Sequence, residues 1–169
     1  RNPIAGWMSQ KNQFNFDLEY EPVDGIGRFL TGTPTAFSMA PIAIGVDLLL
    51  EAGMDRVREK SVAQTEYLIA LWEEFLKPYG FTLNSPRDAK WRGSHVAIGH
   101  VDGWRINQSM ITDMNIIPDF RAPDNIRLGV TPLYTSFTDL HTAITRIQTI
   151  MEEKLYEKYT TETSAHGVT

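Results

Sequence analysis

The chain has 169 residues, no cysteine and a formal net charge of −5. This length allows one domain with its own core, and the absence of cysteine excludes a disulfide framework, a thiolate metal site and a cysteine nucleophile. An acidic chain without a basic patch argues against nucleic acid as a partner. No apolar run reaches the roughly 18 residues that span a bilayer, so no membrane partner is expected, and a chain without cysteine suits the cytoplasm.

The first 34 residues are dense in glycine and proline, which predicts loops around short strands. Within them, residues 14–20 (FNFDLEY) alternate apolar and polar side chains, and this period of two favours a short strand. The chain opens on RNPIAGWMSQ, without an initiator methionine and without the pattern of a signal peptide. We therefore expect a portion of a longer protein.

Two helices are predicted next. Residues 35–53 (TAFSMAPIAIGVDLLLEAG) are apolar on nearly every side, as in a helix buried between layers. Pro41 lies inside this segment and predicts a kink or a later start. Residues 54–80 form an amphipathic pattern that Pro78 and Gly80 bring to an end.

The remaining elements alternate between strand and helix. The pattern predicts a strand over 95–101, a helix over 102–115 capped by Asp102, a short extended piece at IIPDFR, and a strand through Arg127. A long helix over 136–159 follows, with Ser136 near its cap. This order predicts a small α/β layer on a longer helical segment.

Arg127 is the first candidate binding residue. In NIRLGVTPLY (125–134) the apolar side chains alternate onto one face, so Arg127 and Gly129 lie on the opposite face. A guanidinium can bind a carboxylate through two parallel hydrogen bonds, and a glycine beside it leaves room for a ligand. The alternative is a surface ion pair with Asp119 or Asp124.

Two further segments are candidates for anion binding. GRFLTGTPT (27–35) precedes a predicted helix, where backbone amides and hydroxyls can bind phosphate; the alternative is an ordinary helix cap formed by Thr33 or Thr35. Trp7, in AGWM, is either a packing anchor or an indole N–H donor to an anion. The four histidines show no metal-ligand spacing, so no metal site is predicted.

Taken in order, these segments resemble one family. The pieces are GW, YEPVDGIGRFLTGTP, EAGMDRVREKS with TEYL, RGSHVAI and PDFRAPDNIRLGVTPLYTSFTDL, and they look like the C-terminal part of kynureninase. That family has the aspartate aminotransferase fold and uses pyridoxal 5′-phosphate (PLP). The resemblance runs from Gly6 to about Leu140. It implies an α/β fold class, the C-terminal small domain of a PLP fold-type I enzyme, with a short sheet packed with helices and long helices that connect to a large domain.

The resemblance also implies domains and roles. Residues 1–52 would hold cofactor-contacting loops and the start of the helical segment, residues 53–160 the small domain, and residues 161–169 a polar tail. The family is a homodimeric hydrolase of tryptophan catabolism, in the kynurenine pathway towards NAD. It cleaves L-kynurenine, or 3-hydroxykynurenine, to anthranilate, or 3-hydroxyanthranilate, and L-alanine. By position, Trp7 and Thr33 help to hold the cofactor phosphate, Thr33 from across the dimer interface, and Arg127 binds the α-carboxylate of the amino-acid substrate.

The catalytic lysine is expected upstream of these residues. None of the chain's six lysines has the family's tyrosine-lysine-tyrosine context for the Schiff base, so the chain alone is expected to be inactive and to need its own N-terminal portion.

Two departures from the family leave the substrate open. Met8, Ser9 and Gln10 stand where the family has an aromatic residue, a glycine and a histidine, near the aryl end of the substrate, and His95 replaces a glutamine. The alternatives are a related PLP-dependent aminotransferase or cysteine desulfurase-like enzyme, and a non-catalytic α/β interaction module.

Overall fold

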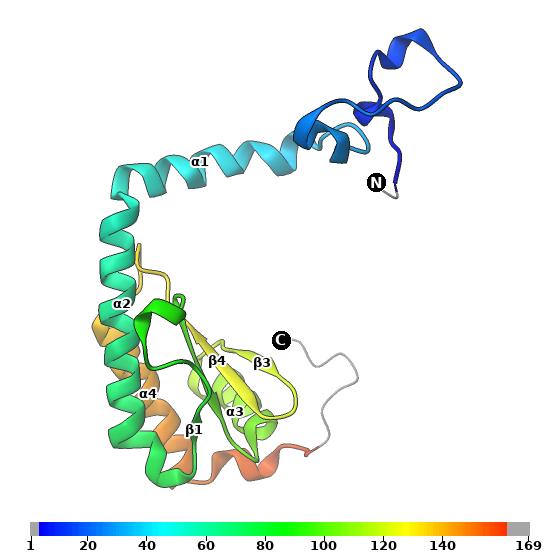
Figure 1. Cartoon of the computed structure of the whole chain (residues 1–169). Helices are drawn as coiled ribbons and strands as arrows, with labels where there is room; N and C mark the ends of the chain where they lie inside the picture. The colour runs from blue at the N-terminus through cyan, green and yellow to red at the C-terminus, as the bar shows by residue number, and fades with distance from the viewer. Residues whose placement is uncertain (1–3, 162–169) are drawn as a thin grey trace. The chain divides into compact units, whose positions relative to one another are not determined.

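The computed structural model describes residues 4–161, and the chain divides into two compact units, residues 1–51 (unit 1) and residues 52–169 (unit 2). Unit 1 contains three short 3-10 helices and most of the first α-helix: η1 (Trp7–Ser9), η2 (Gln13–Asn15), η3 (Gly25–Phe29) and α1 (Ala36–Ala52) (Figure 1). The polar tail predicted for residues 161–169 lies, apart from its first residue, outside the described residues.

The strand predicted for residues 14–20 is wrong. Asn12 and Phe16 have φ angles of 52° and 54°, in the left-handed region, so the chain turns on either side of η2 and does not extend. The rings of Phe14 and Phe16 lie against Trp7, with centroids 5.8 and 5.7 Å from that of the indole. The alternating aromatic residues therefore form a cluster around Trp7 where the pattern predicted a strand.

Helix α1 begins at Ala36, so the later start predicted at Pro41 is wrong, and Pro41 lies within the helix. The carbonyl of Thr35 accepts the first helical bond, from the amide of Met39 at 3.1 Å. No residue of α1 is buried by the described chain, and Phe37 is 92% exposed. The sequence predicted a helix buried between layers, but within residues 4–161 the apolar side chains of α1 are not buried.

Among residues 4–161, no single helix is long and apolar enough to cross a bilayer, and only the consecutive pair Ala36–Ala52 and Met54–Tyr79, taken together, has the length and composition.

The helix predicted for residues 54–80 is confirmed. Helix α2 (Met54–Leu71) continues through a π-helical turn, η4 (Trp72–Leu76), and a 3-10 turn, η5 (Lys77–Tyr79). Gly80 follows with a φ of 92°, a conformation that favours glycine and that ends the helix. The helix buries Leu68, Leu71 and Trp72 in the core of unit 2.

Unit 2 contains a four-stranded antiparallel sheet in the order β1-β2-β4-β3. The strands are β1 (Thr82–Leu83), β2 (His95–Gly99), β3 (Asp119–Arg121) and β4 (Asn125–Gly129), and Figure 1 shows β3 and β4 side by side. The strands predicted near residues 95 and 127 and the extended IIPDFR piece are confirmed. Strand β1 was not predicted, because two residues are too few to show an alternation.

One face of the sheet packs against helices α2 and α3 (Gly103–Met114), and α4 (Phe137–Glu152) packs against both of these helices. This face and the helices supply the buried core, which includes Val96, Ile98, Ile106, Met110, Phe120, Ile126, Leu128, Ile144, Ile147 and Ile150. The side chains on the opposite face of the sheet are small or polar, and among the described residues His95 is exposed and Ala97, Asp119 and Arg127 are partly exposed. The predicted fold class, a short sheet packed with helices, is confirmed.

The caps of α3 and α4 differ from each other. Asp102 occupies the N-cap position of α3, as predicted, but its side chain makes no cap bond and accepts instead from Arg105 at 3.0 Å. Ser136 caps α4 through a complete capping box: its hydroxyl accepts from the amide of Asp139 at 3.1 Å, and the Asp139 carboxylate accepts from the amide of Ser136 at 2.8 Å.

The last helix is shorter than predicted. It ends at Glu152 because Lys154 takes a φ of 52°, and a 3-10 turn, η7 (Leu155–Lys158), follows. Lys158 and Tyr159 then donate hydrogen bonds to the carboxylate of Asp113 on α3, at 2.7 and 3.0 Å. The C-terminal segment is thereby held on α3. The bond from Lys158 is the main reason that the pKa of Asp113 lies below its usual range, against the opposing effect of burial.

The contact between Asp113 and Lys158 predicts a specific pH dependence. Because the folded-state pKa of Asp113 is lowered, its contribution to stability is fully present above the unfolded value of about 3.9 and is lost as the pH falls through the folded-state pKa. We expect Asp113→Asn to lower the free energy of unfolding at pH 6 by about 1–2 kcal/mol. Urea unfolding from pH 6 to pH 2.5 should show this difference shrinking as the acid limit is approached. A constant difference would contradict the assignment.

Candidate functional site

Arg127 lies in the middle of β4, on the face of the sheet opposite the buried core. Its Cα partners are Ala97 on β2 and Asp119 on β3. Its neighbours Ile126 and Leu128 are buried on the core face, so the guanidinium projects from the other face. There Arg127 forms an ion pair with Asp119, one of the two aspartates expected if Arg127 is a surface residue. The side chain of Arg127 is 36% exposed.

The residues beside Arg127 on this face of the sheet have small side chains or none. Ala97 lies across from it on β2, and Gly129 lies two residues further along β4. A Cβ atom built on Gly129 would meet no atom within 4 Å. The exposed His95 is the Cα partner of Gly129. The guanidinium thus has a carboxylate on its β3 side and open space near Gly129, where a ligand could approach.

Helix α2 fixes the two segments that flank this end of the sheet, a role that was not predicted. Gln64, which is fully buried, donates from Nε2 to the carbonyl of Thr135 at 2.7 Å, after β4. The hydroxyls of Ser61 and Ser94 lie 2.7 Å apart, just before β2. In the sequence these polar residues resemble the solvent face of an amphipathic helix, and only their burial reveals the contacts.

Two lysines are engaged in other contacts. Lys11, the one lysine of unit 1, bonds to the Glu21 carboxylate at 2.8 Å, which raises the pKa of Lys11. Lys60 donates to the carbonyl of Pro132 at 2.6 Å. A lysine that forms an imine needs a lowered pKa, so the environment of Lys11 is the opposite of what that chemistry requires.

The other two predicted site residues lie in unit 1, in segments that touch. A Cβ atom built on Gly6 would lie 2.2 Å from the carbonyl oxygen of Thr31, so the two backbones are too close for any other residue. This approach sets the segment that carries Trp7 beside the one that leads to Thr33. Thr33 is exposed, and Trp7 is 47% exposed.

Ser9 and Gln10, two of the residues that depart from the family pattern, tie this loop together. The buried Ser9 hydroxyl lies 2.7 Å from the Tyr20 hydroxyl and bonds to the carbonyl of Gly6 at 2.9 Å. The side-chain oxygen of Gln10 accepts from the amide of Glu21 at 2.9 Å. The departures therefore have partners within unit 1 that explain their polarity.

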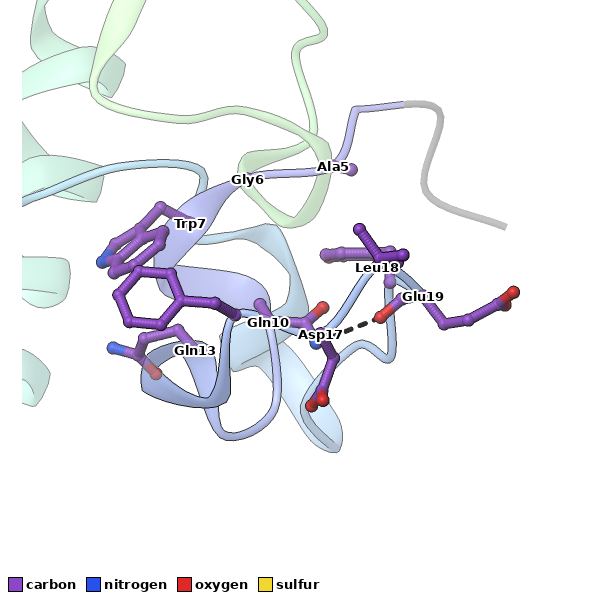
Figure 2. Close-up of a pocket in the computed structure, with 10 residues that line it drawn as sticks. Ala5, Gly6, Trp7, Gln10, Gln13, Asp17, Leu18 and Glu19 are labelled. Carbon is purple, nitrogen blue, oxygen red and sulfur yellow. Dashed lines mark hydrogen bonds between the residues drawn. The ribbon is translucent and has the colours of Figure 1, made fainter.

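A cavity of about 460 Å³ lies next to Trp7 in unit 1. In Figure 2, Trp7 and Gln13 lie on one side of it, Leu18 and Glu19 lie on the other, and the dashed line is the bond from Gln10 to the carbonyl of Glu19. The aromatic cluster around Trp7 thus borders an open, partly polar space.

Residues 57–147 match the family model of the kynureninase C-terminal domain. The chain belongs to this family. It is 38% identical to a kynureninase of Shouchella clausii over 164 residues, which are 96% of this chain and 38% of that protein. It is 37% identical to a kynureninase of Geobacillus thermodenitrificans over 161 residues, 94% of this chain and 37% of that protein.

A kynureninase of Pseudomonas fluorescens is also 37% identical, over 154 residues that make up 91% of this chain and 37% of that protein. The chain therefore spans 37–38% of the length of these curated relatives. The resemblance drawn from the sequence motifs is confirmed at the level of the family. The roles of Trp7, Thr33 and Arg127 stay predictions.

The contact between Gly6 and Thr31 can be tested directly. Gly6→Ala should separate the two segments, because the new methyl group would overlap backbone atoms that cannot rotate away. We expect the indole N–H signal of Trp7 to shift strongly in a two-dimensional ¹⁵N spectrum of the chain. Gly32→Ala is the matched control, since a Cβ atom there meets nothing within 4 Å, and it should leave that signal in place. An unmoved signal in Gly6→Ala would show that the close approach does not hold Trp7.

Proposed function

We propose that the chain is the C-terminal portion of a PLP-dependent hydrolase that cleaves L-kynurenine or 3-hydroxykynurenine at the Cβ–Cγ bond. The products are anthranilate or 3-hydroxyanthranilate and L-alanine. Three relatives named kynureninase, at 37–38% identity over most of this chain, support this proposal over an aminotransferase, a desulfurase or a non-catalytic module. The observation that carries it is the partly exposed guanidinium of Arg127 beside the open surface at Gly129.

In this proposal Arg127 binds the α-carboxylate of the substrate. A guanidinium has five N–H donors in a planar fork, and the ion pair with Asp119 engages Nη2. A carboxylate that lies near Gly129 can accept from the remaining side of the fork. This two-point contact fixes the direction of the amino-acid backbone and hence the position of Cα, where the reaction begins.

The residues of unit 1 fit a phosphate group. Trp7 offers an indole N–H and Thr33 a hydroxyl, both side chains are exposed, and the close approach of Gly6 and Thr31 sets their segments together. PLP, when bound, withdraws electrons from the substrate Cα. Trp7 would hold the phosphate bound in its own subunit, and Thr33 would reach across a homodimer interface to the phosphate bound in the partner subunit.

The remainder of the enzyme completes the proposal. Its own N-terminal portion would supply the lysine for the cofactor, since Lys11 and Lys60 are committed to other contacts. The same portion would cover the exposed apolar surface of α1, which needs a partner in a folded protein. We place the enzyme in the cytoplasm.

Arg127→Lys in the complete enzyme tests the assignment of the carboxylate. Lysine keeps the charge but loses the two-pronged geometry. We expect kcat/KM for kynurenine to fall by roughly two to three powers of ten, which corresponds to about 3–4 kcal/mol of transition-state stabilisation. Steady-state kinetics and thermal unfolding of both proteins should show lost activity with a preserved fold.

The matched control is Arg87→Lys, because Arg87 is a surface arginine that is also ion-paired, to Glu73 at 3.1 Å. It should leave kcat/KM unchanged. A surface ion pair is worth only about 0–1 kcal/mol, so near-equal activity of Arg127→Lys would reduce Arg127 to that role and remove the main support for the function.

Trp7→Phe and Thr33→Ala test the phosphate assignment. Each removes one hydrogen bond to a charged group, worth about 1.5–3 kcal/mol, so the Kd for PLP should rise roughly ten- to hundred-fold in the complete enzyme. Equilibrium dialysis of PLP measures this, and kcat at saturating PLP should change less. Trp91→Phe, at a tryptophan that is 70% exposed in unit 2, and Thr112→Ala, at an exposed threonine of α3, are the controls. Unchanged PLP affinity in both test variants would return Trp7 to a packing role.

A further inference from the structure

The pairing of strands β3 and β4 places Asp119 beside Arg127. The two residues are Cα partners on β3 and β4, and the next pair along is Phe120 with Ile126. Phe120 and Ile126 are fully buried in the core, so they fix the positions of both strands. The backbone of Asp119 therefore stays beside that of Arg127 for as long as β3 and β4 are paired.

The Asp119 carboxylate lies between two guanidinium groups. One oxygen pairs with Nη2 of Arg127, and the other lies 3.2 Å from Nη1 of Arg121. These three side chains together carry one net positive charge. The other aspartate of this face, Asp124, is turned away, because its carboxylate accepts from Asn125 at 2.9 Å and lies near Gly99. One further carboxylate would neutralise the cluster, and that is the charge of the proposed substrate group.

The ion pair contributes little to stability. The side chains of Asp119 and Arg127 are 33% and 36% exposed, and pairs this open to solvent are screened by water. Its larger effect is geometric. A long arginine side chain on an open sheet face samples many rotamers, and a carboxylate fixed on the next strand selects one of them.

We propose that Asp119 is a positioning residue for Arg127. It holds the guanidinium from the β3 side, so that the other N–H groups of the fork face a ligand carboxylate near Gly129. This inference rests on the proposed function, because it assumes that Arg127 binds the substrate carboxylate. The opposite role is a competitor, in which Asp119 occupies the donors that the substrate needs. The two roles predict opposite changes in substrate binding.

The test is Asp119→Asn in the complete enzyme, since asparagine keeps the shape and loses the charge. We expect KM for kynurenine to rise about ten-fold with kcat changed less than about two-fold, as when binding is lost equally from the ground state and the transition state. The calorimetric Kd for L-alanine, the product that keeps the α-carboxylate of the substrate, should rise in parallel. Asp119→Glu should restore part of the affinity. Asp124→Asn is the matched control on the same face and should leave KM unchanged.

The outcomes separate the two proposals. If Arg127→Lys impairs binding and Asp119→Asn does not, Asp119 is not a positioning residue, and the proposed function stands. If KM falls in Asp119→Asn, Asp119 is a competitor and the inference is overturned. If Arg127→Lys has no effect, both proposals fail together. Thermal unfolding of each variant should match the parent, because a loss of fold in Asp119→Asn would itself contradict a role confined to side-chain geometry.

Discussion

The side-chain alternation of strand β4, fixed by its pairing between β2 and β3, is the constraint on which unit 2 depends. Ile126 and Leu128 are drawn into the core with α2, α3 and α4, and burial of such side chains is worth about 1.5–3 kcal/mol each. Since successive side chains point to opposite faces, the side chain of Arg127 must lie on the face opposite the core. A shift of one residue in this pairing would bury the guanidinium and expose two core residues. The core therefore sets the position of the candidate carboxylate site.

Unit 1 depends on a different constraint, a backbone contact. The approach of Gly6 to Thr31 takes the place of a hydrophobic core, since few residues of this unit are buried. The hydroxyl pair of Ser9 and Tyr20 supplements it, as do the edge-on contact of Phe14 and the tilted contact of Phe16 with the Trp7 ring. Such a unit has little apolar burial of its own, and apolar side chains of helix α1, such as Phe37 and Ile44, are exposed in the described part of the chain. The relatives, of which this chain spans 37–38%, are long enough to supply a cover.

The sequence predicted correctly those elements that are determined by residues a few positions apart, and it missed those that depend on distant contacts. The helix cap at Ser136 and the alternation around Arg127 are encoded within a few residues, and both were predicted at the right place. Residues 14–20 have the same alternation, but the left-handed residues Asn12 and Phe16 turn the chain, and none of the described strands pairs with this segment. The contacts of Gln64 and Asp119 join residues that are far apart in the sequence or on different strands. No pattern could choose Asp119 over Asp124 as the partner of Arg127, because that choice belongs to the register of β3 on β4.

The two departures from the family pattern differ in what surrounds them. Ser9 and Gln10 are bonded to Tyr20, Gly6 and Glu21, so their polar character is accounted for by the loop that they close. His95 has a different setting: it is exposed and is the partner of Gly129 across the strand pair, on the face that carries Arg127. A side chain at that position borders the space in which we propose that the substrate carboxylate lies. Residue 95, where histidine replaces glutamine, is therefore the departure that lies near the amino-acid end of the proposed substrate. The loop residues Ser9 and Gln10 instead shape the segment around Trp7.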